Sequence, residues 1–345
     1  MKIPAPPPFP PPGGTPTPDL LMDRCARRLN YLRVSITDRC NLRCTYCMPG
    51  DRIHKLRHED ILSYEEIFRV LRIGADMGIT KVRITGGEPL VRKGVMAFIR
   101  NVCGIDALED VSLTTNGLLL GPQLAALKAA GIRRINVSLD TLRPARYRAI
   151  TGTDGFATVW RALMDALEMG FEPIKINVVA LKGVNDDELV DLARLSIDTP
   201  LHIRFIEHMP IGTSAVPHTA QLLVSEIRAL VETVSPLEPV AATRHDGPAR
   251  RFRFPGARGE VGFISSISSH FCATCNRLRL TARGSIRPCL LADKEVDLRG
   301  LLRAGAPDEA VREAFLAAIR LKGADHGIGP DQACGPSRHM SSIGG

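Results

Sequence analysis

The sequence predicts an α/β fold, an open, TIM-like partial barrel of six strand–helix units, (β/α)6, with a C-terminal extension. Six short apolar runs alternate with longer amphipathic stretches, and each unit takes about 30 residues, the length of a parallel strand with its crossover helix. A closed barrel of eight units typically needs about 250 residues, so six units fit an open barrel better. A doubly wound open sheet remains the alternative, because periodicity alone does not distinguish the two.

Each element follows from its own pattern. The apolar runs predict strands at 31–36, 81–85, 111–114, 135–138, 174–179 and 201–206. A helix between the first two strands is predicted by apolar residues at helical spacing: Tyr64, Ile67, Phe68, Leu71 and Ala75. Gly78 should end this helix, because glycine readily adopts the backbone of a helix C-terminus. Further helices are expected at 158–168, closed by Gly170, and at 186–195.

Beyond residue 213 the alternation stops and prolines interrupt the chain, which indicates a smaller C-terminal region packed on the open side of the barrel. Strands are expected there near 251–254 and 261–264, and a last helix at 308–322. The predicted organisation is a Pro-rich disordered tail over 1–22, the partial barrel over 23–225, and the C-terminal region over 226–345, which ends in Gly-Gly.

Composition narrows the functional classes. The net charge of +8 suits an anionic ligand, and the aromatic content of 5% is low for a protein that stacks single-stranded nucleic acid. No apolar run reaches about 18 residues, so no membrane span is expected. The start lacks the apolar stretch of an export signal, which predicts a cytoplasmic location where cysteines stay reduced.

Six of the nine cysteines fall into two groups: the N-terminal triplet (Cys40, Cys44, Cys47) and the C-terminal triplet (Cys272, Cys275, Cys289). Three thiolates can hold a four-iron cluster by three corners and leave one iron open to a ligand. The first group follows the first strand, at the face where barrel enzymes carry their chemistry. Zinc is the alternative for both groups, with His54 or His58 completing the first and His270 the second.

A Gly86-Gly87-Glu88-Pro89 sequence ends the second expected strand. Glycines allow a ligand to approach the backbone closely and leave N–H and C=O groups for it to bind. The sequence by itself is also compatible with an ordinary turn. Its place one strand after the N-terminal triplet favours a ligand site.

Four expected strands each carry one cation between apolar neighbours: Arg33, Arg83, Lys175 and Arg204. Buried charges need partners, and internal carboxylates such as Glu88, Glu207 or Asp140 are one source of them. Four cations against few acids instead indicate an interior built for a polyanion, and arginine suits bidentate phosphate contacts. A nucleoside triphosphate fits this pattern well.

The segment 34–49, which contains the N-terminal triplet, resembles the signature of radical S-adenosylmethionine (SAM) enzymes, and more narrowly that of the GTP 3′,8-cyclases of molybdenum cofactor biosynthesis. The similarity continues through 83–92, 114–117, 136–140, 175–177, 205–210 and 271–281. The final Gly344-Gly345 is similar to the double-glycine tail of that family. Nearly the whole chain is covered, apart from the Pro-rich tail.

The resemblance implies two [4Fe-4S] clusters, one on each triplet, with SAM at the open iron of the first and the guanine of GTP at the second. The positions matching SAM contacts are Tyr46, Gly86, Gly87, Glu88, Ser138 and Met209. Those matching GTP contacts are Arg33, Arg83, Thr114, Lys175, Arg204, Arg277 and Arg279. Arg277, Arg279, Gly344 and Gly345 match residues that act in catalysis.

The implied reaction begins with a 5′-deoxyadenosyl radical that takes hydrogen from C3′ of GTP. The C3′ radical then attacks C8, giving 3′,8-cyclo-7,8-dihydro-GTP, the first step of molybdenum cofactor biosynthesis. The implied partners are an electron donor such as flavodoxin or ferredoxin, a downstream cyclic pyranopterin monophosphate synthase, and a second copy in a homodimer. Two rivals stay open: another radical SAM enzyme with an auxiliary cluster, and a zinc-binding nucleic-acid module.

Two features depart from the family pattern. The Pro-rich tail is additional and has no predicted role. His208 stands between Glu207 and Met209, where an aromatic or apolar residue is expected, and packing is the role predicted for it.

Overall fold

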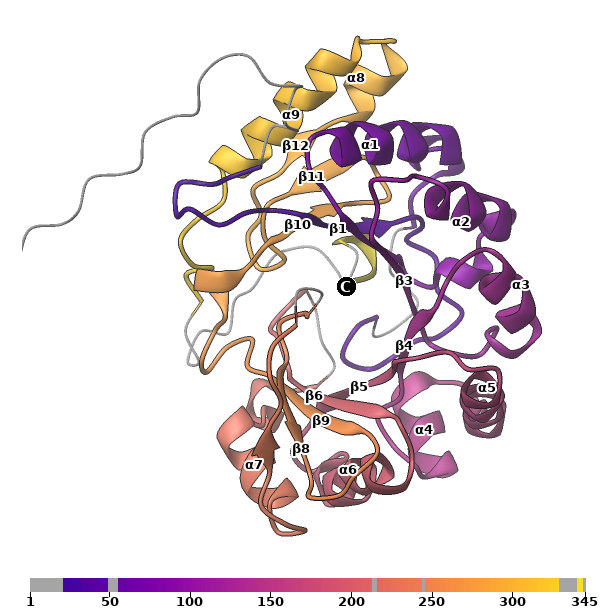
Figure 1. Cartoon of the computed structure of the whole chain (residues 1–345), viewed down its shortest axis with the longest axis vertical. Coiled ribbons are helices and arrows are strands. Elements are labelled where there is room, and N and C mark those ends of the chain that lie inside the picture. The colour runs from indigo at the N-terminus through magenta and orange to yellow at the C-terminus, as the bar shows by residue number, and fades with distance from the viewer. Residues whose placement is uncertain (1–20, 49–54, 213–215, 244–245, 329–339, 344–345) are drawn as a thin grey trace, which may run out of the picture.

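The structure is a computed structural model that describes residues 21–48, 55–212, 216–243, 246–328 and 340–343. One sheet of twelve strands curves into an open ring (Figure 1). Its central strands are consecutive and parallel: β1 (Tyr31–Ser35), β2 (Lys81–Thr85), β3 (Asp110–Thr115), β4 (Arg134–Ser138), β5 (Ile174–Ala180) and β6 (His202–Glu207). This order confirms the open partial barrel. A doubly wound sheet is excluded, because its strand order would reverse.

The C-terminal region extends both edges of this sheet. β9 (Glu260–Ile264) pairs parallel to β6, and β10 (Arg277–Leu280) pairs parallel to β1. The remaining strands continue outward in antiparallel pairs: β7 (Glu238–Pro239) and β8 (Arg250–Arg253) beyond β9, and β11 (Ser285–Arg287) and β12 (Val296–Asp297) beyond β10. The region beyond residue 225 is therefore built into the same sheet as the barrel. The sequence did not predict β10, because its alternating arginines and leucines suit a surface segment equally well.

Helices cover the outside of the ring (Figure 1). They are α1 (Tyr64–Asp76), α2 (Val95–Cys103), α3 (Leu124–Ala129), α4 (Pro144–Thr151), α5 (Phe156–Glu168), α6 (Leu189–Asp198), α7 (Val224–Val231), α8 (Arg299–Arg303) and α9 (Asp308–Arg320). The short helix α10 (Met340–Ile343) lies inside the ring instead. Short 3-10 helices occupy His58–Asp60, Pro89–Val91, Gly121–Gln123, Asp186–Glu188, His218–Ala220 and Cys272–Thr274. Ser63 and Glu66 form a capping box at the start of α1, and Gly78 follows its end with φ of 113°, as predicted.

The two faces of the central strands differ in chemistry. Outward residues such as Leu32, Val34 and Ile84 are buried against the helices in one large apolar core. Inward residues are largely polar or charged, and the pairing register aligns Arg33 with Arg83 on one side and with Arg279 on the other. Three arginines therefore stand side by side across β10, β1 and β2, an arrangement that like-charge repulsion disfavours unless an anion joins them.

The described residues nearest the two ends of the chain pack in different apolar clusters. The described residues start at Leu21, which is buried in the main core, so the predicted tail over 1–22 lies outside them except for its last two residues. Near the C-terminus, Ile343 of α10 packs with Ile211, Ile267 and Leu291 in a second apolar cluster. α10, in yellow, lies in the middle of the ring in Figure 1.

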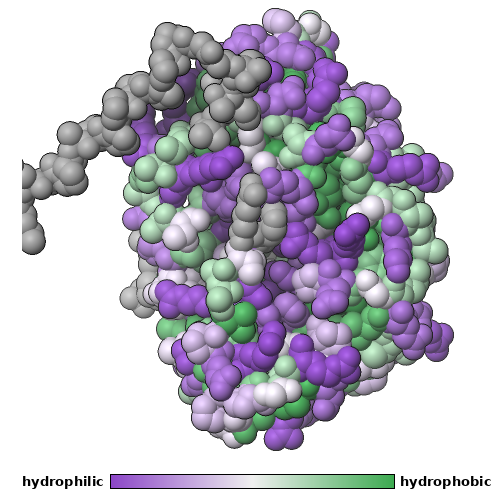
Figure 2. Space-filling view, in the orientation of Figure 1, coloured by the Kyte–Doolittle hydropathy of each residue, from purple (hydrophilic) through white to green (hydrophobic). Residues whose placement is uncertain are grey.

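The molecular surface carries mixed chemistry. Hydrophilic and hydrophobic residues alternate over the face in Figure 2, without one broad apolar area there. Among the described helices, none is long and apolar enough to cross a bilayer.

Candidate active site between the two cysteine triplets

A cavity of about 290 Å³ opens at the C-terminal ends of the central strands, the end predicted to carry the chemistry. All six cysteines of the two triplets line it. The N-terminal triplet lies in the loop after β1, and the C-terminal triplet surrounds β10 and β11. The sheet pairing of β10 with β1 brings the two groups together, although they are far apart in the sequence.

The N-terminal triplet is held in a tight turn. The amides of Cys47 and Met48 both donate to the carbonyl of Cys44, and the amide of Leu42 lies 3.4 Å from the Cys40 sulfur. Burial raises the pKa of Cys44 well above its ordinary value and that of Cys47 to about 12, with neighbouring negative groups adding to both. Three buried thiols gathered this way favour a positively charged metal centre, which would ionise them.

Gly86 and Gly87 allow the loop that carries Cys40 to lie against β2. A Cβ on Gly86 would lie 2.6 Å from the Thr37 carbonyl oxygen, and one on Gly87 would lie 2.6 Å from the Arg39 carbonyl carbon. The amide of Gly87 donates to Thr37 at 2.7 Å. The prediction that these backbone N–H groups stay free for a ligand is therefore wrong for Gly87. The cysteine loop packs so closely against β2 that the Thr37 carbonyl already accepts a hydrogen bond from this amide.

Gly87→Ala should therefore displace the cysteine loop. Overpacking a closely fitted site typically costs about 1–3 kcal/mol, and here the added methyl meets backbone that cannot rotate away. We expect a lower thermal unfolding midpoint and less iron at the N-terminal triplet after anaerobic reconstitution. Gly121→Ala is the control, since its Cβ would meet only Ala162 at 3.7 Å. Equal iron content in the two variants would contradict this explanation.

The internal carboxylates do not neutralise the strand cations. Glu88 accepts hydrogen bonds from the amides of Leu90 and Asn116 and from the Thr115 hydroxyl. Burial raises its pKa to about 7. Glu88 does not line the cavity, so its side chain positions the loop after β3 and is not placed to touch a bound ligand there.

Asp140 and Glu207 are likewise satisfied by neutral donors. Asp140 accepts from the Tyr46 hydroxyl at 2.7 Å and the Val179 amide at 2.8 Å. Glu207 accepts hydrogen bonds from the backbone amides of Ile267 and Ser268, in the loop after β9, and from the amide of Val224. It also accepts one from the Ser268 hydroxyl. Among the described residues, none of the three predicted carboxylates forms an ion pair with Arg33, Arg83, Lys175 or Arg204.

The cavity gathers most of the residues expected at a SAM or GTP site. Those lining it are Arg33, Tyr46, Arg83, Gly86, Gly87, Thr114, Ser138, Arg204, Met209, Arg277 and Arg279. Lys175 lies apart, lining a second, small cavity at the base of the barrel together with Arg204. Gly344 and Gly345 lie outside the described residues, but Met340 and Ser341 of α10 line the main cavity.

Arg204 is held in place by two asparagine side chains that the sequence had not identified as site residues. Its Nη2 donates to the side-chain oxygens of Asn136 and Asn177, each at 2.6 Å, while its Nε has no hydrogen-bond partner among the described residues. Burial lowers the pKa of Arg204 to about 9, and the charge of Arg83 adds to this. Both asparagines lie at inward positions of their strands. The alternation of inward and outward residues along a strand was the sequence signal that could have identified them.

Lys175 is a strongly perturbed cation of the interior. Burial lowers its pKa to about 6, and the positive charges of Arg204, Arg83, Lys81 and Arg134 add to the effect. In the described part of the chain it forms no ion pair. By contrast, Lys81 and Arg134 share the buried carboxylate of Asp110.

Compact groups of possible metal ligands are one test of the zinc alternative. Among the described residues, one group has three possible ligand atoms within 4.8 Å of one another: His270, Cys272 and His326. It contains His270, the histidine of the zinc alternative for the C-terminal triplet. In that part of the chain, the three sulfurs of neither triplet form such a group.

Two family models match the chain. The Radical SAM superfamily model covers residues 34–196, and the Molybdenum Cofactor Synthesis C model covers residues 201–328. The GTP 3′,8-cyclase of Moorella thermoacetica is 50% identical over 325 residues, 94% of this chain and 100% of the relative. The GTP 3′,8-cyclase of Pelotomaculum thermopropionicum is 47% identical over 94% of this chain and 100% of its own length.

Solved structures agree on the fold. Streptococcus suis SuiB has a TM-score of 0.57 at 17% identity and covers 86% of this chain and 67% of its own. Native anSMEcpe with bound AdoMet has a TM-score of 0.54 at 14% identity, and the match covers 86% of this chain and 81% of that structure's chain. The barrel, the N-terminal triplet and the matched superfamily define a radical SAM enzyme. Within that class, the chain belongs to the GTP 3′,8-cyclase family.

Proposed function

We propose that this chain converts GTP to 3′,8-cyclo-7,8-dihydro-GTP, the first step of molybdenum cofactor biosynthesis, with SAM and two [4Fe-4S] clusters as cofactors. The observation that carries the proposal is one cavity with a cysteine triplet on each side and arginines from several strands between them. Family membership supports the reaction, and the cation-rich interior supports a triphosphate as the substrate's anionic part.

The N-terminal triplet would hold the first cluster, which when bound supplies the electron that splits SAM into methionine and a 5′-deoxyadenosyl radical. Tyr46, Ser138 and Met209 line the cavity near that triplet and would orient SAM. The protein's own contribution is positioning and the exclusion of water, because a primary carbon radical takes hydrogen from whatever it meets.

The triphosphate of GTP would bind across the arginine row. Arg33, Arg83 and Arg279 are adjacent by register, and Arg204 lies across the same cavity. Arg83, Arg204 and Arg279 are buried, and charge-assisted hydrogen bonds are strong in such surroundings. The guanine would then face the C-terminal triplet, with Arg277 beside it. Gly344 and Gly345 would complete the site as a tail continuing from α10.

The remaining assignments extend this proposal. An external one-electron donor such as a flavodoxin or ferredoxin would reduce the clusters, and a cyclic pyranopterin monophosphate synthase would consume the product. The cytoplasm is the proposed location, and a homodimer the proposed assembly. The proposed organisation remains a partial barrel over 23–225 with a C-terminal cluster region over 226–345.

Two measurements on anaerobically reconstituted protein test the function. Metal analysis should find about eight irons per chain, as two four-iron clusters require. With dithionite, SAM and GTP, 5′-deoxyadenosine should form in step with the loss of GTP. Zinc in place of iron would overturn the cluster assignment. Release of 5′-deoxyadenosine that ignores GTP would favour the rival reading, a radical SAM enzyme acting on another substrate such as a peptide.

A further inference from the structure

Lys322 places a buried ammonium group against the C-terminal triplet. It follows α9, and only 7% of the residue is exposed. Its Nζ donates to the carbonyl of Pro288 at 2.7 Å and to that of Arg277 at 3.0 Å, and it lies 3.6 Å from the sulfur of Cys275. A lysine ammonium has three N–H donors, so each one has a partner here.

These partners belong to both segments that carry the triplet. Arg277 begins β10 two residues after Cys275, and Pro288 immediately precedes Cys289. One ammonium group therefore links the chain on either side of the β10–β11 hairpin. No motif in the sequence singled out Lys322, because it is distant from every cysteine along the chain.

Arg27 fixes the backbone beside Lys322. Its guanidinium donates to the carbonyls of Cys272 and Gly323, both at 2.6 Å, and its Nε pairs with the buried carboxylate of Asp23 at 2.6 Å. Gly323 is the residue after Lys322. The backbone that carries Lys322 is thus fixed from the N-terminal segment as well as from α9.

Cys275 is electrostatically distinct from its neighbour Cys272. Arg277 Nη2 also lies 3.6 Å from the Cys275 sulfur. Lys322 Nζ lies at the same distance from that sulfur, so two cationic groups contact this one corner of the triplet.

We propose that Lys322 is a positioning residue that raises the reduction potential of the iron–sulfur cluster held by Cys272, Cys275 and Cys289. This inference rests on the proposed function, which places a cluster there. Hydrogen bonds to a cluster's sulfur ligands and nearby positive charge both stabilise the reduced form, which carries one more electron. Arg277 lines the substrate cavity as well, whereas Lys322 does not, so Lys322 offers a way to change the potential without touching GTP.

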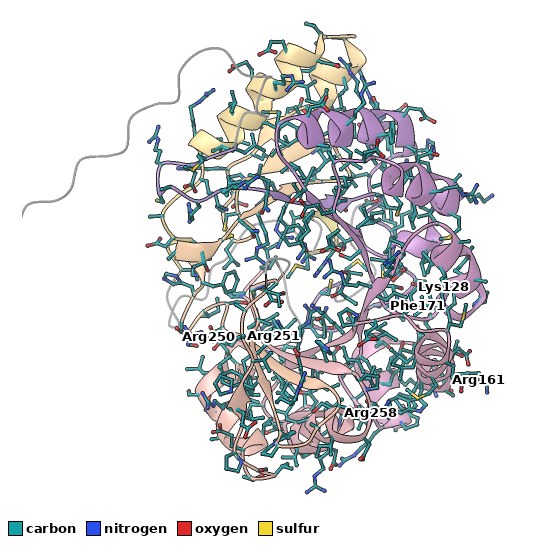
Figure 3. The ribbon with its side chains drawn as sticks, viewed as in Figure 1. Lys128, Arg161, Phe171, Arg250, Arg251 and Arg258 are labelled. Carbon is teal, nitrogen blue, oxygen red and sulfur yellow. The ribbon has the colours of Figure 1, made fainter. Side chains whose placement is uncertain are left out.

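The test is a potentiometric titration of the full-length chain, followed by electron paramagnetic resonance, with dithionite as the one-electron reductant. A background with Cys40, Cys44 and Cys47 changed to Ala leaves the C-terminal cluster alone and isolates its signal. Lys322→Met removes the charge and its donors, and Lys322→Arg keeps a cation. Lys128→Met is the matched control, since Lys128 is exposed on α3 at the outer rim of the molecule (Figure 3).

Lys322→Met should load the same iron as the unsubstituted chain and titrate at a more negative potential. Lys322→Arg should recover most of that shift, and Lys128→Met should show none. An unchanged potential in Lys322→Met at full iron content would overturn the inference. Failure of Lys322→Met, Lys322→Arg and Lys322→Gln alike to hold a cluster would overturn it too, by making Lys322 a brace of the fold. Absence of iron from the unsubstituted chain would instead overturn the proposed function.

Discussion

Arg83→Met should weaken GTP binding by roughly 10- to 150-fold, which corresponds to the loss of about 1.5–3 kcal/mol in hydrogen bonds to a charged group. The same substitution should raise the thermal unfolding midpoint. Arg83 is 7% exposed, lies directly opposite Arg33, and has the Ser112 hydroxyl at 3.3 Å as a neutral partner. Replacing a buried, repelled charge with an apolar side chain of similar length is neutral or stabilising.

The prediction is informative because its two effects are opposite in sign: GTP binding should weaken while the thermal unfolding midpoint should rise. Calorimetric titration with GTP and a thermal melt of the same preparation measure both. Arg134→Met is the control, because Arg134 is paired with Asp110, which is buried. That variant should lose stability while keeping most of its GTP affinity. If Arg83→Met were destabilised and bound GTP normally, Arg83 would be a structural residue and the triphosphate would bind elsewhere.

GTP binding should take up close to one proton at pH 8, through Lys175. In the free protein the pKa of Lys175 is about 6, lowered by burial and by the surrounding cations, so the group is mostly neutral at pH 8. Lys175 shares the small cavity with Arg204, which also lines the main cavity, so a triphosphate bound against Arg204 should raise the pKa of Lys175 and protonate its amine. Affinity should therefore be greatest near pH 6 and should fall by about tenfold per pH unit above it, until the pKa of the complex is reached. Below about pH 6, protonation of the terminal phosphate should weaken binding.

Calorimetry in two buffers with different heats of ionisation measures the proton uptake. At pH 8 the terminal phosphate, with a second pKa of about 6, is already ionised and contributes little. Lys175→Met should bind GTP more weakly and take up almost no proton. Lys175→Arg should bind without uptake, because arginine is already charged. The same uptake in Lys175→Met as in the unsubstituted chain would assign the proton to another group.

Local sequence patterns predicted the strand–helix order well. All six central strands lie within a residue or two of their expected bounds, and α1 and α9 begin at the expected residues. The reason is physical: alternation of apolar and polar residues and the glycines after helices act over a few residues, so they are visible in the sequence. Helices α2, α3, α4, α7, α8 and α10 were not predicted individually.

Local sequence patterns predicted the candidate site only in part. The spacing of residues identified the cysteine triplets and the strand cations. It did not show whether carboxylates neutralise those cations. Glu88, Asp140 and Glu207 lie close in the sequence to residues of the site, and each turned out to hold neutral donors. Hydrogen-bond partners depend on side-chain direction in three dimensions, which spacing does not encode.

By itself, the sequence determined six strand–helix units, two groups of three cysteines and four strand cations, and it favoured an open barrel over a doubly wound sheet. Tertiary structure alone decided that β10 joins β1, so that Arg279 stands next to Arg33 and both triplets line one cavity. It also decided that Lys322 lies against Cys275. Pairing between distant segments is set by packing over the whole sheet, and a pattern read over a few residues carries no information about which edge a late strand will join.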